Sequence, residues 1–227
     1  MYPFRPSRRR FLRSAPLGAI AALGSNGVMQ ENSVAAQTPQ NPDAALRELI
    51  AGNQRFAAGR ITAYEHDFTA LKRQTVDKQE PFATILSCSD SRVPLELVFD
   101  QTIGHIFVCR VAGNIVTPEM IASIEFSVAV LGVKAILVMG HVGCGAVKAA
   151  MEGKSVPGQI SALFPHIQPA IEQAGGNFDA AIKANARFQA GLLRTASTVV
   201  SESVRNNKVK VTAACYDLAT GKVGLLD

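Results

Sequence analysis

The chain has 227 residues, of which 48% are apolar, and this length and composition suit a single globular domain with a short leading segment. A formal charge of +5 would favour nucleic acid or membrane partners if it were spread along the chain. Five arginines and one acidic residue, however, precede residue 37, and beyond that point 18 basic residues face 17 acidic ones. The main part of the chain lacks the basic surface of a nucleic-acid-binding protein, and we expect no such partner.

The first 36 residues have the pattern of an export signal. The stretch Ser7–Arg13, Ser-Arg-Arg-Arg-Phe-Leu-Arg, resembles the twin-arginine motif, and an apolar stretch over Ala15–Leu23 and several small residues follow it. Because this stretch has about nine residues and a bilayer span needs about twenty, we expect no permanent membrane anchor. Cleavage after Ala35 or Ala36 would leave one domain over residues 37–227. The protein would then be periplasmic or otherwise exported through the twin-arginine machinery; a disordered basic arm is the alternative.

Apolar periodicity predicts strands that alternate with helices. Residues 43–58 predict an amphipathic helical arm, which either folds back on its own domain or embraces a second subunit. Helical spacing also extends over 118–131 and, as one long stretch, over 178–206, and a turn leads to a last short strand at 223–226. Four apolar runs are typical of buried parallel strands: 82–86, 106–109, 135–139 and 209–214. We therefore expect an α/β fold with a mostly parallel central sheet of about four strands plus an antiparallel edge strand, flanked by helices.

The four cysteines lie in two kinds of surroundings. Cys109 and Cys215 fall within or at the end of predicted strands, where a free cysteine is usually a small buried apolar residue. Cys88 and Cys144 follow strand ends instead, in the polar stretches Cys-Ser-Asp-Ser-Arg and Gly-His-Val-Gly-Cys-Gly. An oxidising compartment would permit disulfides, but these surroundings indicate chemistry for the second pair.

A metal site is predicted where the two polar motifs meet. Ligands gather at the carboxyl ends of parallel strands, so Cys88, His141 and Cys144 face one point if their strands are neighbours. Thiolate and imidazole are ligands that zinc favours. Three protein ligands leave the fourth tetrahedral position open, as in catalytic rather than structural sites. We predict one Zn²⁺ per subunit.

These motifs, with Arg-Val-Ala-Gly-Asn at 110–114 between them, resemble the β-class carbonic anhydrases, and the likeness runs from about residue 44 to residue 221. The resemblance implies reversible hydration of carbon dioxide to bicarbonate and a proton, and assembly as a homodimer or homotetramer. It also favours the arrangement in which the helical arm over 43–58 embraces a second subunit, with Gln79 and Phe107 near the interface. It assigns three sets of residues: the zinc ligands Cys88, His141 and Cys144, the catalytic dyad Asp90 and Arg92, and the substrate pocket residues Gln79, Phe107 and Gly145.

The motif residues also indicate a mechanism. Zinc acidifies its bound water, but two thiolates cancel the formal charge of the ion, so this water is expected to ionise above about pH 7. Asp90 would accept the proton of the zinc-bound hydroxide and orient it, while Arg92 keeps Asp90 ionised. Two alternatives stay open: the dyad is a solvated ion pair that caps the following turn, or Asp90 itself ligates zinc in a resting form.

Two other functions also stay open. One is hydrolysis of carbonyl sulfide or carbon disulfide on the same fold, and the other is a zinc-binding module without turnover. A closed structural site would carry a fourth protein ligand rather than the polar pair Asp90 and Arg92, which argues against the module. The chain departs from some plant-type members of the family at Phe126 and Val130, where those carry a tyrosine and a histidine, so proton export would follow another route.

Overall fold

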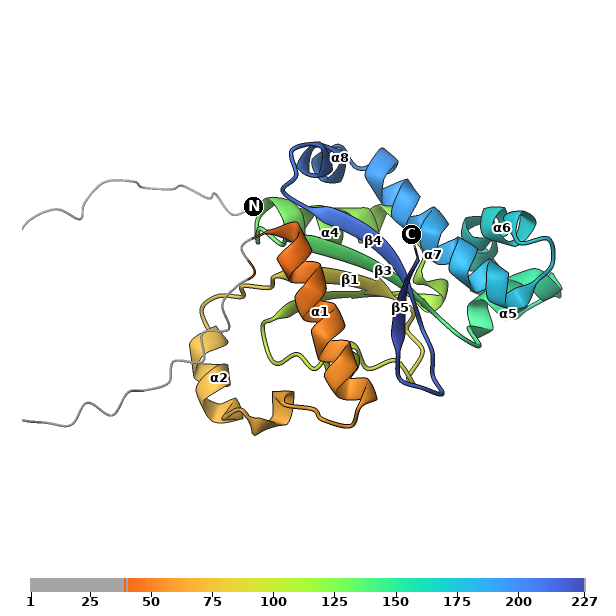
Figure 1. Cartoon of the computed structure of the whole chain (residues 1–227). Helices are drawn as coiled ribbons and strands as arrows, with labels where there is room; N and C mark the ends of the chain where they lie inside the picture. The colour runs from red at the N-terminus through yellow and green to blue at the C-terminus, as the bar shows by residue number, and fades with distance from the viewer. Residues whose placement is uncertain (1–38, 40, 227) are drawn as a thin grey trace, which may run out of the picture. The chain divides into compact units, whose positions relative to one another are not determined.

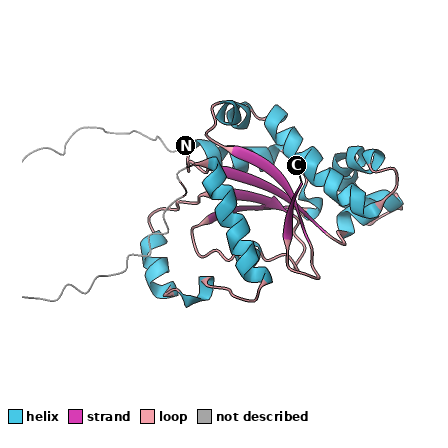
Figure 2. Ribbon diagram, viewed as in Figure 1, coloured by secondary structure: helices cyan, strands magenta, loops and turns pink. Residues whose placement is uncertain are grey.

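The computed structural model describes residues 39 and 41–226, and the export signal predicted over residues 1–36 lies outside them. Five strands form one sheet, in the order β2-β1-β3-β4-β5. Its strands are drawn in magenta in Figure 2. Their bounds are β1 Ala83–Ser87, β2 Ile106–Arg110, β3 Ala135–His141, β4 Lys210–Tyr216 and β5 Val223–Leu226. The first four strands are parallel and β5 pairs antiparallel with β4. The predicted fold class is confirmed.

Helices precede the sheet and connect its strands. They are α1 Pro42–Ala57, α2 Phe68–Thr75, α3 Leu95–Val98, α4 Pro118–Ala129, α5 Gly145–Glu152, α6 Phe164–Gln173, α7 Phe178–Ala196 and α8 Thr198–Arg205, with 3-10 turns η1 Ala63–Glu65, η2 Ala112–Asn114 and η3 Ile160–Leu163. Within the described part of the chain, no helix is both long enough and apolar enough to cross a bilayer.

The prediction of a single long helix over 178–206 is wrong, because the helix is interrupted at Ser197 and a second helix begins after it. This residue has an extended backbone, with φ −109° and ψ 118°, and its side chain accepts a hydrogen bond from the backbone N–H of Val200. A serine in this position satisfies an N–H that the first turn of a helix leaves free, so it begins a new helix rather than continuing the old one.

Both faces of the sheet are covered at its centre, because every residue of β1 and β3 is buried and successive strand residues point to opposite sides. On one face Leu137 and Ala214 lie in the same apolar cluster as Ala45 and Leu49 of α1, and Figure 1 shows α1 lying across the sheet. The other face packs against α4, α7 and α8. In this structure α1 therefore packs on the sheet of its own domain. The embrace of a second subunit, which the family resemblance favours, stays a prediction.

A buried carboxylate ties α1 to the segment that follows it. The side chain of Asp100 is fully buried and accepts hydrogen bonds from Arg55 of α1, from the backbone N–H groups of Thr62 and Ala63 at 2.8 and 2.7 Å, and from the hydroxyl of Thr62 at 2.8 Å. Burial alone would raise the pKa of Asp100, but these donors outweigh it and the pKa is lowered.

Strand order reverses at β1. The chain runs from β1 to β2 on one side and then crosses to β3 on the other side of β1. Sheets of this kind form ligand sites at the carboxyl ends of the strands where such a reversal occurs. Because Ser87 pairs with Met139 in the parallel register of β1 and β3, the residues that follow leave adjacent strands at the same edge of the sheet.

Candidate metal centre

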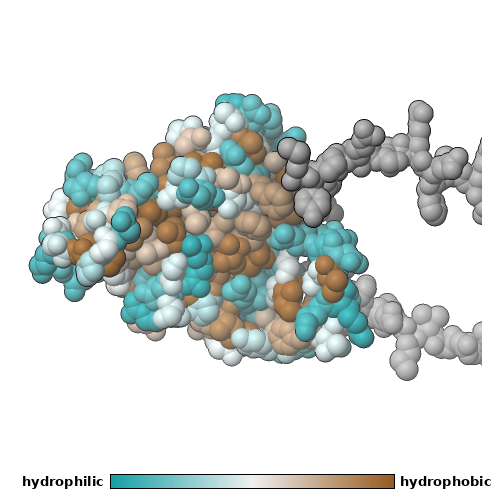
Figure 3. Space-filling model, turned by 180° about the vertical axis from the view of Figure 1, so that it is seen from behind, coloured by the Kyte–Doolittle hydropathy of each residue, from teal (hydrophilic) through white to brown (hydrophobic). Residues whose placement is uncertain are grey.

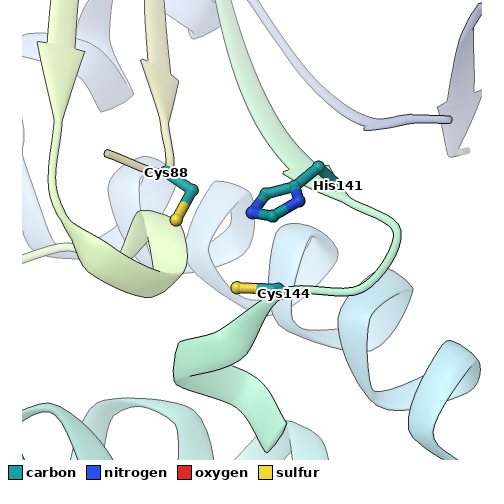
Figure 4. Close-up of side chains that lie close together, drawn as sticks. All are labelled: Cys88, His141 and Cys144. Carbon is teal, nitrogen blue, oxygen red and sulfur yellow. The ribbon is translucent and has the colours of Figure 1, made fainter. Parts of the chain in front are cut away.

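The structure brings the three predicted metal ligands together. Cys88 follows β1, His141 is the last residue of β3, and Cys144 directly precedes α5. All three are buried and their ligand atoms lie within 4.8 Å of one another. Figure 4 shows the two sulfurs and the imidazole ring pointing toward one another. Among the described residues, this is the group of histidine, cysteine and acidic side chains that could hold a metal ion.

The imidazole of His141 is prepared to act as a ligand. Its Nδ1 lies 3.0 Å from the carbonyl oxygen of Val142, and a carbonyl only accepts, so Nδ1 carries the proton and Nε2 keeps its lone pair. Nε2 is buried and has no hydrogen-bond partner. A buried polar atom without a partner costs about 1–3 kcal/mol, and a metal ion would satisfy it. With two cysteine sulfurs beside it, the donor set fits zinc.

The hydrogen bond between the two thiols favours ionisation of one of them, Cys88. The pKa of Cys88 is lowered, first by its hydrogen bond with Cys144 and also by His141 and by the backbone N–H of Gly113, although burial opposes these effects. The pKa of Cys144 is raised, because the same thiol pair and burial favour its protonated form. Cys88 is therefore the better anionic ligand before any cation arrives, and binding a divalent cation would release the proton of Cys144.

Asp90 and Arg92 lie together beside the cluster. The Nε and NH2 groups of Arg92 donate to the two carboxylate oxygens of Asp90 at 2.9 and 2.8 Å, and this pairing holds the pKa of Asp90 well below its usual range. Oδ2 of Asp90 lies 3.8 Å from Nε2 of His141. A third side-chain bond, from Arg92 to the carbonyl of Gly143 at 3.5 Å, connects the two motif loops.

The three residues assigned to a substrate pocket occupy different places. Gly145 directly follows Cys144 as the first residue of α5. Phe107 lies on β2 and contacts Phe126, with ring centroids 6.4 Å apart. Gln79 is exposed and precedes β1, whereas Cys88 follows it, so the length of the strand, about 17 Å, separates them. The hydrogen bonds described within this chain do not connect Gln79 to the cluster, and its role in the substrate pocket stays a prediction.

Arg110 is a further residue of the site that sequence reasoning gave no role. It ends β2, opposite Ser87, and its Nε donates to the carbonyl of Cys88 at 3.0 Å. Its NH2 group donates to the carbonyl of Asp90 at 2.6 Å. The guanidinium therefore holds the loop that carries both the sulfur ligand and the carboxylate. Its position at the carboxyl end of a strand next to the motif was the sequence feature that could have revealed it.

Comparison with known proteins places the chain in a family. The model of the carbonic anhydrase family matches residues 83–223. The chain is 32% identical over 197 residues to carbonic anhydrase 2 of Mycobacterium tuberculosis, an alignment that covers 82% of this chain and 94% of that protein. It is 33% identical over 195 residues to the carbonic anhydrase of Mycolicibacterium smegmatis, with coverage of 82% and 93%.

The solved structures identify the class. A β-carbonic anhydrase of Aspergillus fumigatus matches with a TM-score of 0.64 and 26% identity, over 80% of this chain and 90% of that one. The chain belongs to the β-class carbonic anhydrase family. A β-carbonic anhydrase of Sordaria macrospora, described as tetrameric, shares the fold with a TM-score of 0.64 at 21% identity, over 80% and 96% of the two chains. As a carbonic anhydrase, this chain has its cysteine and histidine cluster at the carboxyl ends of β1 and β3.

Proposed function

We propose that the protein hydrates carbon dioxide reversibly to bicarbonate and a proton, with one zinc ion held by Cys88, His141 and Cys144. The observation that carries this proposal is the buried, unpartnered Nε2 of His141 facing two cysteine sulfurs. When bound, zinc lowers the pKa of a coordinated water and so supplies a nucleophile near neutral pH. Three protein ligands leave a tetrahedral position open for that water.

Asp90 and Arg92 orient the reacting water in this proposal. Both oxygens of the carboxylate are fixed by the guanidinium, and Oδ2 is close to the metal-facing nitrogen of His141. A carboxylate held in this way accepts a hydrogen bond from the water and determines which lone pair faces the substrate. Apolar side chains, Ile115 and Val147 among them, pack around the two sulfurs and suit a small substrate without charge.

We further propose that the protein works as a homodimer or homotetramer. β2 is an edge strand, and Phe126 of α4 and Val130, which directly follows that helix, are 45% and 65% exposed. Figure 3 views the side opposite to that of Figure 1, and apolar side chains gather over its middle. A second copy on this face would bring another Phe107 and another Gln79 near the first subunit, in agreement with their predicted pocket roles.

The twin-arginine motif supports a proposal about location. Residues 1–36 would direct the protein through the twin-arginine machinery to the periplasm, or otherwise out of the cytoplasm, leaving residues 37–227 as the mature domain. This machinery carries folded proteins, so the metal would be acquired before export.

Stopped-flow measurement of carbon dioxide hydration on the zinc-loaded protein tests the function, with His141→Ala as the matched control. We expect turnover by the wild type and none above background by the variant. Hydrolysis of carbonyl sulfide or carbon disulfide without carbon dioxide hydration would establish the first alternative. Stoichiometric zinc without turnover on any of these substrates would establish the non-catalytic module.

A further inference from the structure

The sulfur of Cys88 accepts a hydrogen bond from the backbone of a residue that has no room for a side chain. The backbone N–H of Gly113 donates to Sγ at 3.4 Å. Gly113 has a left-handed backbone, with φ 77° and ψ 12°. A Cβ atom at this position would lie 2.9 Å from Cδ1 of Ile167. Both the backbone angle and the close packing require glycine here, and the peptide can therefore approach the sulfur.

A helix on the far side of Gly113 holds this residue in place through its carbonyl, which belongs to the next peptide group. Asn185 of α7 is completely buried, and its Nδ2 donates to the carbonyl of Gly113 at 2.8 Å. The same glycine therefore donates to the candidate ligand through its N–H and accepts from α7 through its carbonyl. Because a buried amide costs free energy unless its hydrogen bonds are made, packing alone would be served better by an apolar side chain such as leucine.

Gln189, one turn further along α7, fixes the orientation of Asn185. Its Nε2 donates to Oδ1 of Asn185 at 3.1 Å and to the carbonyl of His166 at 2.8 Å, while its Oε1 accepts from the N–H of Val116 at 2.8 Å. With Oδ1 engaged by Gln189, the Nδ2 group of Asn185 is the end that faces Gly113. The two amides form one fully buried chain of hydrogen bonds that ends at the cluster.

We propose that Asn185 is a positioning residue of the metal centre, which aims the N–H of Gly113 at the sulfur of Cys88 and thereby limits how much charge that sulfur donates to the metal. Two thiolates cancel the formal charge of a divalent ion, and a hydrogen bond to one of them withdraws electron density and restores part of the positive charge. The inference rests on the proposed role of Cys88 as a ligand.

Cobalt substitution measures thiolate donation directly. The purified full chain is stripped of metal and reloaded with Co²⁺, and the sulfur-to-cobalt charge-transfer band and the d–d bands are recorded for wild type and Asn185→Leu. We expect the charge-transfer band of the variant to move to longer wavelength, because a sulfur that has lost its hydrogen bond is easier to oxidise, while the d–d bands remain tetrahedral. Asn185→Ala replaces the leucine variant if that fails to fold, since it removes the amide without adding bulk.

Ser197→Ala is the matched control. Ser197 is also buried and also belongs to the α7–α8 region, where its hydroxyl donates to Glu125 at 2.6 Å and accepts from Val200 at 3.1 Å, with no hydrogen bond to the cluster. Its loss should lower the Tm and leave the cobalt spectrum unchanged. An unshifted band in the Asn185 variants would overturn the inference and leave Asn185 a packing residue. A wild type that takes up cobalt without a sulfur charge-transfer band would overturn the proposed ligand role of the cysteines and this inference with it.

Discussion

Arg92 donates to both carboxylate oxygens of Asp90 although only one residue separates them in the chain, with Nε to Oδ1 at 2.9 Å and NH2 to Oδ2 at 2.8 Å. The backbone N–H of Arg92 adds a third bond to Oδ1 at 3.0 Å. A two-pronged pairing of this kind fixes the plane of the carboxylate as well as its charge. Asp90 is therefore held rigidly at one side of the cluster, and because it is not one of the three predicted metal ligands, its proposed role can be tested without removing a ligand.

Replacing Asp90 by asparagine should leave zinc in place and lower kcat/KM about 10- to 100-fold. The amide keeps the size of the side chain but loses the charge and the pairing with Arg92. Metal analysis and stopped-flow hydration on the same sample provide the measurement. A variant with the wild-type rate would reduce the dyad to a support for the loop.

Arg92→Ala should shift the pH dependence of activity rather than only lower the activity at every pH. Since the pKa of Asp90 is held well below its usual range, with Arg92 as the first cause, loss of the arginine raises it toward about 4 and leaves the carboxylate ionised at neutral pH. The carboxylate is then free to move toward the metal and compete with water, most strongly at low pH. We expect wild-type kcat/KM to rise through mildly alkaline pH and the variant curve to lie at still higher pH. A mutant curve lowered in parallel would contradict this role for Arg92.

Single replacements of Cys88, His141 or Cys144 by alanine should remove stoichiometric zinc together with activity, because two ligands rarely hold this ion tightly. Cys109→Ala is the control. Cys109 is buried on β2, and burial raises the pKa of its thiol to about 11, so it behaves as an apolar residue. The control should retain its zinc, as measured by metal analysis after gel filtration. Full zinc in any of the three ligand variants would contradict the assignment.

Asp100→Asn should destabilise the fold by about 2–4 kcal/mol at neutral pH, because it leaves Arg55 and two buried backbone donors without their anionic partner. Asp100 has a left-handed backbone, with φ 47°, which asparagine tolerates, so the change tests the charge rather than the turn. The pKa of Asp100 is lower in the folded than in the unfolded chain. Its stabilisation is therefore complete above about pH 4 and is lost as the pH falls through the folded value. Urea unfolding of both proteins should show the difference shrinking in acid, and a constant difference would contradict the argument.

Arg8→Lys combined with Arg9→Lys should retain active enzyme in the cytoplasm, since the twin-arginine machinery discriminates between arginine and lysine at these positions. Fractionation followed by the hydration assay measures this. Undiminished periplasmic activity in the double variant would remove the basis of the export proposal.

The central strands were predictable because β1 and β3 are short apolar runs buried on both faces, and the run at 135–139 corresponds to β3 at Ala135–His141. The order of the strands in the sheet was not predictable, since β2 and β3 carry similar apolar runs and neither run indicates on which side of β1 its strand will pair. The residues of the site likewise divide into those that the sequence predicted and those that it did not. Cys88, Asp90 and His141 stand in polar motifs at strand ends, whereas Asn185 lies in the middle of an alanine-rich helix, where its sequence context is that of an exposed polar residue. Only the packing of α7 onto η2 gives Asn185 its partner.

The reversal of strand order at β1 has a consequence for which metal the protein acquires. Cys88 and His141 become neighbours only after β2 and α4 have been inserted between them and β3 has returned to pair with β1. An ion held by both residues therefore requires β1 and β3 to have paired, so it would be selected by the metal pool of the compartment in which the chain folds. A site with two sulfurs and one imidazole binds copper at least as well as zinc on intrinsic affinity, so geometry alone does not protect it. If the chain crosses the membrane already folded, as proposed above, the metal pool of the cytoplasm would decide which ion it carries.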